Sequence, residues 1–178
     1  KISSLTSAQV GSLTAGQVGV LSSAQAKALI GDTAELSQLT VDQVKSFSTA
    51  AIAGLTPTQV SWLATDQLQG LTTKQVSALN TAQLDALTTK QIGQLSTAQI
   101  QALTSTQAAA LTTDTAELSK LTADQIKSFS TIAVSGLRTN QVNSLNSDQF
   151  AALTTAQAKS LTTAQLNTLT TVQASSLN

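Results

Sequence analysis

The sequence contains no cysteine and no histidine. Without cysteine there is neither a disulfide framework nor a thiolate metal site, and without histidine the most common metal ligand and general base of proteins is missing. Serine and threonine are plentiful, but no histidine is present to activate one of them as a nucleophile. These absences predict a protein that is not an enzyme and has no catalytic residues, no cofactor and no metal ion.

Charged residues are scarce as well. Nine lysine and arginine residues balance nine aspartate and glutamate residues, and only 10% of all residues are charged. Such a surface has no field that would hold phosphate backbones or anionic lipids, so nucleic acid is not an expected partner. No apolar run approaches the roughly 18 residues that a membrane span needs, so we expect no membrane insertion.

The chain instead repeats one short pattern along its length. Each repeat, here called an octad, has Leu at position 1, Thr at position 2, Gln at position 5 and an apolar residue such as Val at position 6. Twenty-one repeats cover residues 5–176; nineteen have eight residues, and two, 29–38 and 111–120, have ten. The repeats begin at Leu5, Leu13, Leu21, Leu29, Leu39, Phe47, Leu55, Leu63, Leu71, Leu79, Leu87, Leu95, Leu103, Leu111, Leu121, Phe129, Leu137, Leu145, Leu153, Leu161 and Leu169.

A longer period lies over the octads. Residues 31–55 return as residues 113–137, an offset of 82 residues that contains nine octads and one ten-residue repeat. Internal repetition of this kind predicts a single repeat array over 1–178, with superrepeats at approximately 5–86 and 87–168 and a partial third at 169–178.

A repeat of eight residues matches neither a long helix nor a plain sheet. In a continuous helix, eight residues advance the pattern by about 80°, so the apolar positions would wander around the helix instead of forming a stripe. In a continuous strand, positions 1 and 6 would point to opposite faces. Both structures are therefore disfavoured.

The octad is typical of a very short helix with its own start signal. Position 2 is Ser, Thr, Asn or Asp in 19 repeats, all but those with Ala64 and Arg138, and position 5 is Gln in 17 and Glu in two. This is the capping box, in which the N-cap side chain and the side chain three residues later each accept the other's backbone N–H. Positions 1 and 6 then form the hydrophobic staple. Pro57, the only proline, falls at the first helical position, where its missing N–H costs nothing.

A helix of one to two turns is not stable alone, so neighbouring repeats must bury its apolar side. We therefore predict an all-α fold, a solenoid of very short capped helices with one helix per octad. Positions 1 and 6 and the frequent Ala at position 4 are expected to line a shared interior, with Phe47 and Phe129 replacing Leu where the core is wider. The alternative is a β-solenoid whose coils are the octads.

Three sets of side chains are candidates for a binding site. Asp32 with Glu35, and Asp114 with Glu117, recur in the ten-residue repeats and suggest calcium, but an acidic capping box explains them and the Asp- and Gly-rich calcium loop is missing. The Gln column would form a ladder on a binding face, although capping uses the same side chains. Paired threonines at positions 2 and 3 would form hydroxyl ranks suited to ice or glycans, but the second rank is broken. These pairs are Thr72–Thr73, Thr88–Thr89, Thr154–Thr155, Thr162–Thr163 and Thr170–Thr171.

The remaining single residues are weaker candidates for a functional site. Trp62 is more typical of packing or surface decoration than of a sugar platform. Arg138 replaces a cap residue, and the loss of one cap costs about 1 kcal/mol. The lysines are spread among acidic residues and indicate a solvated mixed face. They are Lys27, Lys45, Lys74, Lys90, Lys120, Lys127 and Lys159.

Segments such as LTTAQLNTLTTVQ and LSTAQIQALTSTQ resemble the Leu-Thr-Gln octad tracts of very large secreted bacterial surface proteins, some of them adhesins or RTX-type proteins. The likeness covers practically the whole chain. It implies an extracellular location at the bacterial cell surface and a role in attachment or biofilm matrices. The chain lacks the Gly-Gly-x-Gly-x-Asp nonapeptide of RTX proteins, so calcium-driven folding and the secretion signal are not implied.

The leading functional hypothesis is structural: a stalk or a self-assembling filament, with other copies of the chain as end-to-end partners. The alternative is a binding module that displays a Thr, Gln and Asn surface to glycans, ice or a protein, with the ligand unknown.

Overall fold

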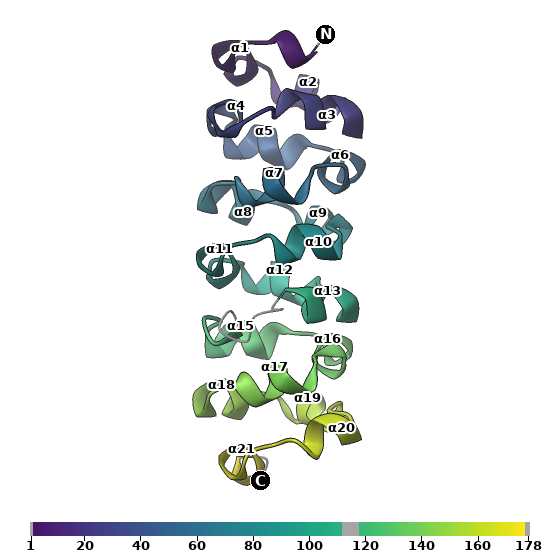
Figure 1. Cartoon of the computed structure of the whole chain (residues 1–178), viewed down its shortest axis with the longest axis vertical. Coiled ribbons are helices and arrows are strands. Elements are labelled where there is room, and N and C mark those ends of the chain that lie inside the picture. Colours follow the sequence, from purple (N-terminus) through teal and green to yellow (C-terminus); the bar gives the residue numbers. More distant parts are fainter. Residues whose placement is uncertain (1, 112–117, 177–178) are drawn as a thin grey trace. The chain divides into compact units, whose positions relative to one another are not determined.

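The computed structural model describes residues 2–111 and 118–176, and the structural statements below concern those residues. They form short helices joined by short links, without a strand in either described range (Figure 1). The predicted all-α solenoid is confirmed, and the alternative β-solenoid is wrong. Asp114 and Glu117 lie outside the described residues.

The chain divides into two compact units, unit 1 at Lys1–Leu87 and unit 2 at Thr88–Asn178. Unit 1 holds a short 3-10 helix and ten α-helices: η1 (Ile2–Ser4), α1 (Ser7–Gly11), α2 (Ala15–Gly19), α3 (Ser23–Leu29), α4 (Thr33–Gln38), α5 (Val41–Ser46), α6 (Thr49–Ala53), α7 (Pro57–Ser61), α8 (Thr65–Gly70), α9 (Thr73–Ala78) and α10 (Thr81–Asp85). The described helices of unit 2 are α11 (Thr89–Gly93), α12 (Thr97–Gln101), α13 (Ser105–Ala110), α15 (Ala123–Ser128), α16 (Thr131–Gly136), α17 (Thr139–Ser144), α18 (Ser147–Ala151), α19 (Thr155–Lys159), α20 (Thr163–Leu166) and α21 (Thr171–Ser175).

Each described α-helix begins where the capping box predicts. The residue at position 2 is extended, as for Thr56 with φ −71° and ψ 155°, and the helix starts at the next residue. Pro57 occupies that first helical position in α7, as predicted. The staple positions on either side of the cap are both buried, for example Leu87 and Ile92 around the start of α11.

The helices end without a left-handed residue. No residue of the described ranges has a positive φ, so glycine does not terminate these helices by its usual mechanism. The chain instead turns extended at the next position 1, as at Leu79 with φ −62° and ψ 136°, and stays extended through the following N-cap Asn80. A two-residue extended link therefore joins one helix to the next.

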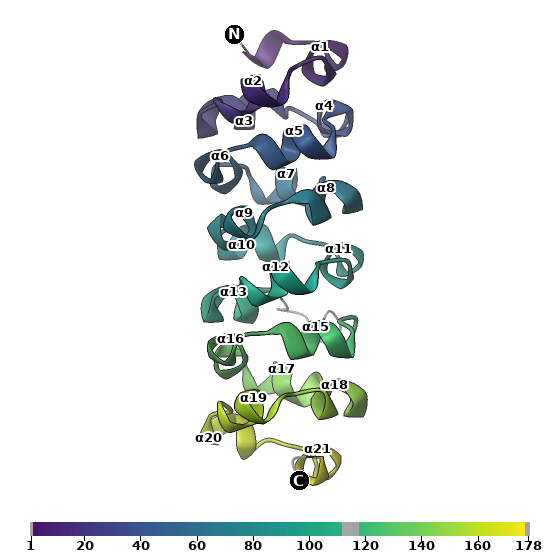
Figure 2. The same ribbon diagram turned by 180° about the vertical axis from the view of Figure 1, so that it is seen from behind.

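Helices three repeats apart pack against each other. In unit 1, α1 packs on α4, α2 on α5, α3 on α6, α5 on α8, α6 on α9 and α7 on α10. In unit 2, α12 packs on α15, α13 on α16, α15 on α18, α16 on α19, α17 on α20 and α18 on α21. Three consecutive repeats therefore make one turn of a solenoid, and the successive turns within each unit can be followed in Figure 1 and, from behind, in Figure 2.

The core consists of positions 1 and 6, as predicted, but not of position 4. Phe47 and Phe129 at position 1 are each only 4% exposed. The alanines at position 4, such as Ala82 and Ala98, are exposed, because this second helical position faces away from the preceding turn. The interior position that the sequence interpretation missed is position 5, where the glutamine side chains are buried.

The first ten-residue repeat, 29–38, places its two extra residues before the N-cap. The preceding helix α3 extends to Leu29, and Leu29 and Ile30 are both buried before the chain turns at Gly31 into the N-cap Asp32. The insertion thus lengthens the link and leaves the helix start in phase with its neighbours.

Three glycines at position 8 let successive turns approach closely. A Cβ at Gly136 would lie 2.5 Å from the Ser105 Cβ and 2.9 Å from its Cα, one turn earlier. A Cβ at Gly54 would overlap the Ser23 Cβ, and a Cβ at Gly70 would overlap the Val41 Cγ1 methyl group. Glycine is required here for space between turns, not for backbone conformation.

We expect Gly136→Ala to lower the free energy of unfolding by about 1–3 kcal/mol, because the added methyl group overlaps backbone atoms of Ser105. The matched control is Gly93→Ala, whose Cβ would meet nothing closer than the Lys120 carbonyl oxygen at 3.6 Å. The control should be neutral or stabilising by up to about 1 kcal/mol. Chemical denaturation followed by circular dichroism measures both, and equal effects would contradict the close approach.

Candidate functional site

The most regular chemical feature of the molecule is its column of buried glutamine side chains at position 5. These residues are Gln43, Gln59, Gln67, Gln75, Gln83, Gln91, Gln99, Gln107, Gln125, Gln141, Gln149, Gln157, Gln165 and Gln173. A buried carboxamide costs free energy unless its oxygen and nitrogen are hydrogen-bonded, so the partners of these groups define what the column does.

The carboxamide oxygen closes the start of its own helix. In α10 the Gln83 Oε1 accepts the backbone N–H of Asn80 at 2.8 Å, while the Asn80 side chain accepts the N–H of Gln83 at 2.9 Å. This is the predicted capping box, and it recurs with Thr or Ser at position 2 along both units. The predicted role of this Gln side chain as a cap of its own helix is therefore confirmed.

The carboxamide nitrogen joins one turn to another. The Gln83 Nε2 donates to the carbonyl oxygens of Ile52 at 3.0 Å and Leu55 at 2.7 Å, at the end of α6. In unit 2 the Gln149 Nε2 donates in the same way to Leu118 at 3.0 Å and Leu121 at 2.6 Å. Each such side chain therefore caps the start of one helix and the end of another helix 28–31 residues earlier.

The sequence held a signal for this second role. Glutamine and glutamate both satisfy a capping box, because only the side-chain oxygen is used. Position 5 nevertheless holds Gln in 17 repeats and Glu in two. Only the amide has N–H groups that can donate to carbonyl oxygens of the preceding turn. The preference for Gln thus indicates a donor role that local capping does not explain.

The described acidic pair, Asp32 and Glu35, is a capping box. The Asp32 Oδ1 accepts N–H groups from Ala34 at 2.7 Å and Glu35 at 3.1 Å, and the Glu35 Oε2 accepts the N–H of Asp32 at 3.1 Å. In the described ranges no three Asp or Glu side chains gather as metal ligands would. The carboxylates of this pair are used by backbone N–H groups.

In the two repeats without a capping residue at position 2, the backbone N–H of the Gln at position 5 has another acceptor. Neither Ala64 nor Arg138 accepts a cap hydrogen bond. The N–H of Gln67 donates instead to Asp66 Oδ1 at 2.9 Å, and the N–H of Gln141 donates to Asn140 Oδ1 at 3.0 Å. The expected loss of one cap at Arg138 is therefore offset by the side chain at position 4.

The threonine pairs do not form two free hydroxyl ranks. The first threonine of each pair uses its oxygen as the N-cap acceptor, as Thr88 does for the N–H of Gln91 at 3.3 Å. The second threonine occupies the first helical position, where Thr73 and Thr155 are exposed. One rank of hydroxyls is thus committed to the fold, and the second faces solvent except at Thr89, which is half-buried.

The remaining candidate residues are exposed or half-buried. The seven lysines named above are all exposed, in agreement with a solvated face. Trp62 is half-buried at the end of α7. None of the described helices combines the length and the apolar character needed to cross a membrane.

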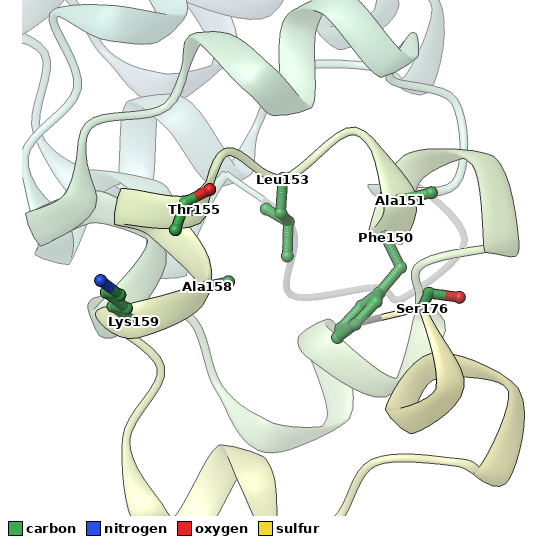
Figure 3. A pocket seen from close by; sticks show the side chains of 7 residues that line it. All are labelled: Phe150, Ala151, Leu153, Thr155, Ala158, Lys159 and Ser176. Atoms are coloured by element: carbon green, nitrogen blue, oxygen red, sulfur yellow. The ribbon is translucent and has the colours of Figure 1, made fainter. Parts of the chain in front are cut away.

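A cleft of about 470 Å³ opens in unit 2 between α18, α19 and the end of α21. Its walls are Phe150, Ala151, Leu153, Thr155, Ala158, Lys159 and Ser176. Figure 3 shows the Phe150 and Leu153 side chains projecting into this space. The lining combines the apolar side chains of Phe150 and Leu153 with the hydroxyl groups of Thr155 and Ser176 and the amine of Lys159.

In the described ranges each repeat forms one helix, three repeats make one turn, and one repeated side chain joins the turns within each unit. This arrangement defines a structural repeat protein of the α-solenoid class. The model of the ALTTAQ repeat family matches residues 63–97, 78–113 and 118–155, which together cover half of the chain. The chain belongs to the ALTTAQ repeat family. Among curated proteins no match is found.

The family name corresponds to one stretch of the structure. Residues 152–157 read ALTTAQ, from position 8 of one repeat to position 5 of the next. In that stretch Thr154 is the N-cap of α19, and Gln157 Oε1 accepts the Thr154 N–H at 2.8 Å while its Nε2 donates to the Phe129 carbonyl oxygen at 2.7 Å. The family pattern therefore contains the Thr of octad position 2, which caps the helix, and the Gln of octad position 5, which caps the helix and joins it to an earlier turn.

We expect Gln83→Ala to lower the free energy of unfolding by about 2–4 kcal/mol, because it removes a cap and leaves buried carbonyl oxygens without a donor. The matched control is Gln17→Ala in α2. Gln17 forms the same capping box but is exposed, so its loss should cost about 1 kcal/mol. Gln83→Glu keeps the acceptor and removes the donor, and it should be at least as harmful as Gln83→Ala. Urea denaturation tests all three, and equal losses for Gln17 and Gln83 would contradict the inter-turn role.

In α17 the side chain of Asn140 accepts the N–H that a capping residue at 138 would otherwise accept, which predicts an energetic coupling between residues 138 and 140. Asn140→Ala should cost about 1 kcal/mol, because the N–H of Gln141 loses its acceptor. In an Arg138→Thr background the same change should cost little, since the threonine hydroxyl takes over as N-cap. A double-mutant cycle measures this coupling, and a cost for Asn140→Ala that is the same in both backgrounds would disprove the substitution of one cap by the other.

Proposed function

We propose that this chain is a structural repeat region of an extracellular bacterial surface or matrix protein and that it acts as a stalk or filament segment. The single observation that carries the proposal is the recurrence of the same buried Gln contact from turn to turn in both units. The buried glutamine side chains are used to join helices, which is the requirement for a spacer and leaves these groups unavailable to a ligand.

The chemistry of the exposed residues supports the same proposal. The repeats bring hydroxyl and amide groups to the surface, with few charges and no histidine. Such a surface offers neither a nucleophile with its base nor a field for a charged partner. We therefore propose no catalytic role. The resemblance to octad tracts of large secreted surface proteins, including adhesins, supports an extracellular location and a role in attachment or biofilm matrices.

The second candidate is a binding module for glycans, ice or a protein. It is favoured by one observation, the solvent-facing threonines at the first helical position, such as Thr73, Thr155, Thr163 and Thr171. A glycan array and an ice-recrystallisation assay separate the two functions, because a stalk gives no signal in either assay and a binding module gives one.

The extracellular proposal predicts that antibodies raised against residues 1–178 label intact cells that produce the protein. Protease added outside the cells should remove this labelling, and permeabilisation should not increase it. An antibody against a cytoplasmic protein serves as the control and should label only permeabilised cells. If the repeat antibodies also needed permeabilisation, the extracellular proposal would be wrong.

A further inference from the structure

Two described helices have alanine where the buried glutamine column has its carboxamide. Position 5 is Ala51 in α6 and Ala133 in α16, and both alanines are fully buried. Each of these helices packs on one helix of the preceding turn and one of the following turn: α3 and α9 for α6, and α13 and α19 for α16. We call the contact of α3 with α6 and the contact of α13 with α16 the alanine seams.

The alanine seam of unit 2 lacks the hydrogen bonds of a glutamine carboxamide. The Ser130 side chain still accepts the N–H of Ala133 at 3.1 Å, but Ala133 has no oxygen to accept the N–H of Ser130. One turn earlier, the Leu103 carbonyl oxygen has the place at which a position-5 glutamine donates, as Gln165 does to Leu137 at 2.7 Å. Among the residues that the structure describes, neither the Ser130 N–H nor the Leu103 carbonyl oxygen has a hydrogen-bond partner, and Leu103 is only 3% exposed.

The alanine seam of unit 1 lacks the same bonds. The Ser48 side chain accepts the N–H of Ala51 at 3.0 Å, and no side-chain oxygen at position 5 returns to the N–H of Ser48. The carbonyl oxygen of the half-buried Leu21 corresponds to that of Leu103, and it too receives no donor from residues 2–111 or 118–176. Equivalent backbone groups are therefore unpaired at places ten repeats apart in the sequence.

Contacts between small residues take the place of these hydrogen bonds. A Cβ at Gly136 would lie 2.9 Å from the backbone Cα of Ser105, so the two turns meet backbone to backbone. At the contact of α5 with α8, which has the donor Gln67, a Cβ at Gly70 would meet the side chain of Val41 and come no closer than 3.8 Å to its carbonyl oxygen. Alanine, glycine and serine have little apolar surface to bury, so the close approach supplies limited hydrophobic stabilisation.

Opening has a different cost at the two kinds of contact. Where a glutamine joins two turns, opening breaks hydrogen bonds of its Nε2 group to buried carbonyl oxygens, as for Gln149 with Leu118 and Leu121. At an alanine seam no such bond breaks. Opening there instead lets water reach an N–H and a carbonyl oxygen that have no partner in the closed turn, which favours the open form.

We infer that the alanine seams are the yield points of the stalk, at which each unit opens more readily than at the turns before and after them. The inference rests on the proposed structural function and adds a mechanical property to it. Each turn of a solenoid contacts only its neighbouring turns, so one contact opens while the others stay closed. Extension under load therefore begins at places that the sequence repeats after 82 residues, and the turns joined by glutamine stay folded.

Hydrogen exchange at one backbone amide per repeat tests this inference in the unaltered chain. In the six helices compared, the N–H at position 6 donates to the carbonyl oxygen at position 2 of the same repeat at 3.0–3.1 Å. All six position-6 residues are Val or Ile and at most 1% exposed, so the amides are matched in bonding and burial. The test amides are those of Ile52 and Val134, and the controls, from the helices on either side along the chain, are those of Val44, Val60, Ile126 and Val142.

We expect the Ile52 and Val134 amides to exchange at least tenfold faster than the four controls, measured by nuclear magnetic resonance and corrected for the local sequence. Gln83→Ala creates a further contact without its glutamine, between α7 and α10. In this variant the Leu84 amide should exchange at least tenfold faster than in the unaltered chain, and the Val44 amide, in α5, should be unchanged.

Two results overturn the inference. The first is exchange of Ile52 and Val134 that is equal to or slower than exchange of the controls, because the close packing would then hold these turns as firmly as glutamine does. The second is exchange at Leu84 that Gln83→Ala leaves unaltered in a folded chain. If Gln83→Ala loses its helical circular dichroism signal, the comparison within the unaltered chain decides.

Neither result bears on the location of the protein, which the labelling of cells tests. Fast exchange at both alanine seams in a protein that antibodies reach only after permeabilisation would support the opening and contradict the proposed function. Slow exchange at the seams in a protein labelled on intact cells would leave the proposed function and remove the yield points.

Discussion

A buried glutamine carboxamide, bonded at both ends, is the interaction on which the rest of this structure depends. Its oxygen accepts an N–H at the start of its own helix, and its nitrogen donates to carbonyl oxygens where an earlier helix ends, as Gln75 does for Thr72 and Phe47. The same side chain thus satisfies two kinds of unpaired backbone group. Because these groups lie between turns, where they are buried, neither helix end has free access to water as a partner.

Very short helices make this requirement unusually strict. The first four N–H groups and the last four carbonyl groups of any α-helix lack partners within it. In a five-residue helix such as α10 or α12, nearly every backbone group is of this kind. Side chains must therefore supply partners in every repeat, which explains why positions 2 and 5 are as regular as the apolar positions 1 and 6. Hydrogen bonding of the backbone groups at helix ends therefore constrains the fold as much as the burial of apolar side chains does.

Local features of the fold could be predicted from the sequence because they depend on residues a few positions apart. The N-cap column, the staple and the place of Pro57 follow from spacing alone, and all are found. The number of repeats per turn could not be predicted, because it depends on contacts about 30 residues apart. For the same reason the sequence indicates a local cap or a ladder on a binding face for the Gln column and not a link between turns, and the prediction that Ala at position 4 lies inside is wrong. The prediction of one array over 1–178 stays a prediction beside the two compact units.

Exchange of the glutamine side-chain amide hydrogens with solvent tests the central claim most directly. In a uniformly nitrogen-labelled chain, nuclear magnetic resonance distinguishes each Nε2 group. The Nε2 hydrogens of Gln83 and Gln157, which are bonded to the preceding turn, should exchange orders of magnitude more slowly than those of Gln9, Gln17 and Gln25. Equal and rapid exchange at all five residues would contradict the account.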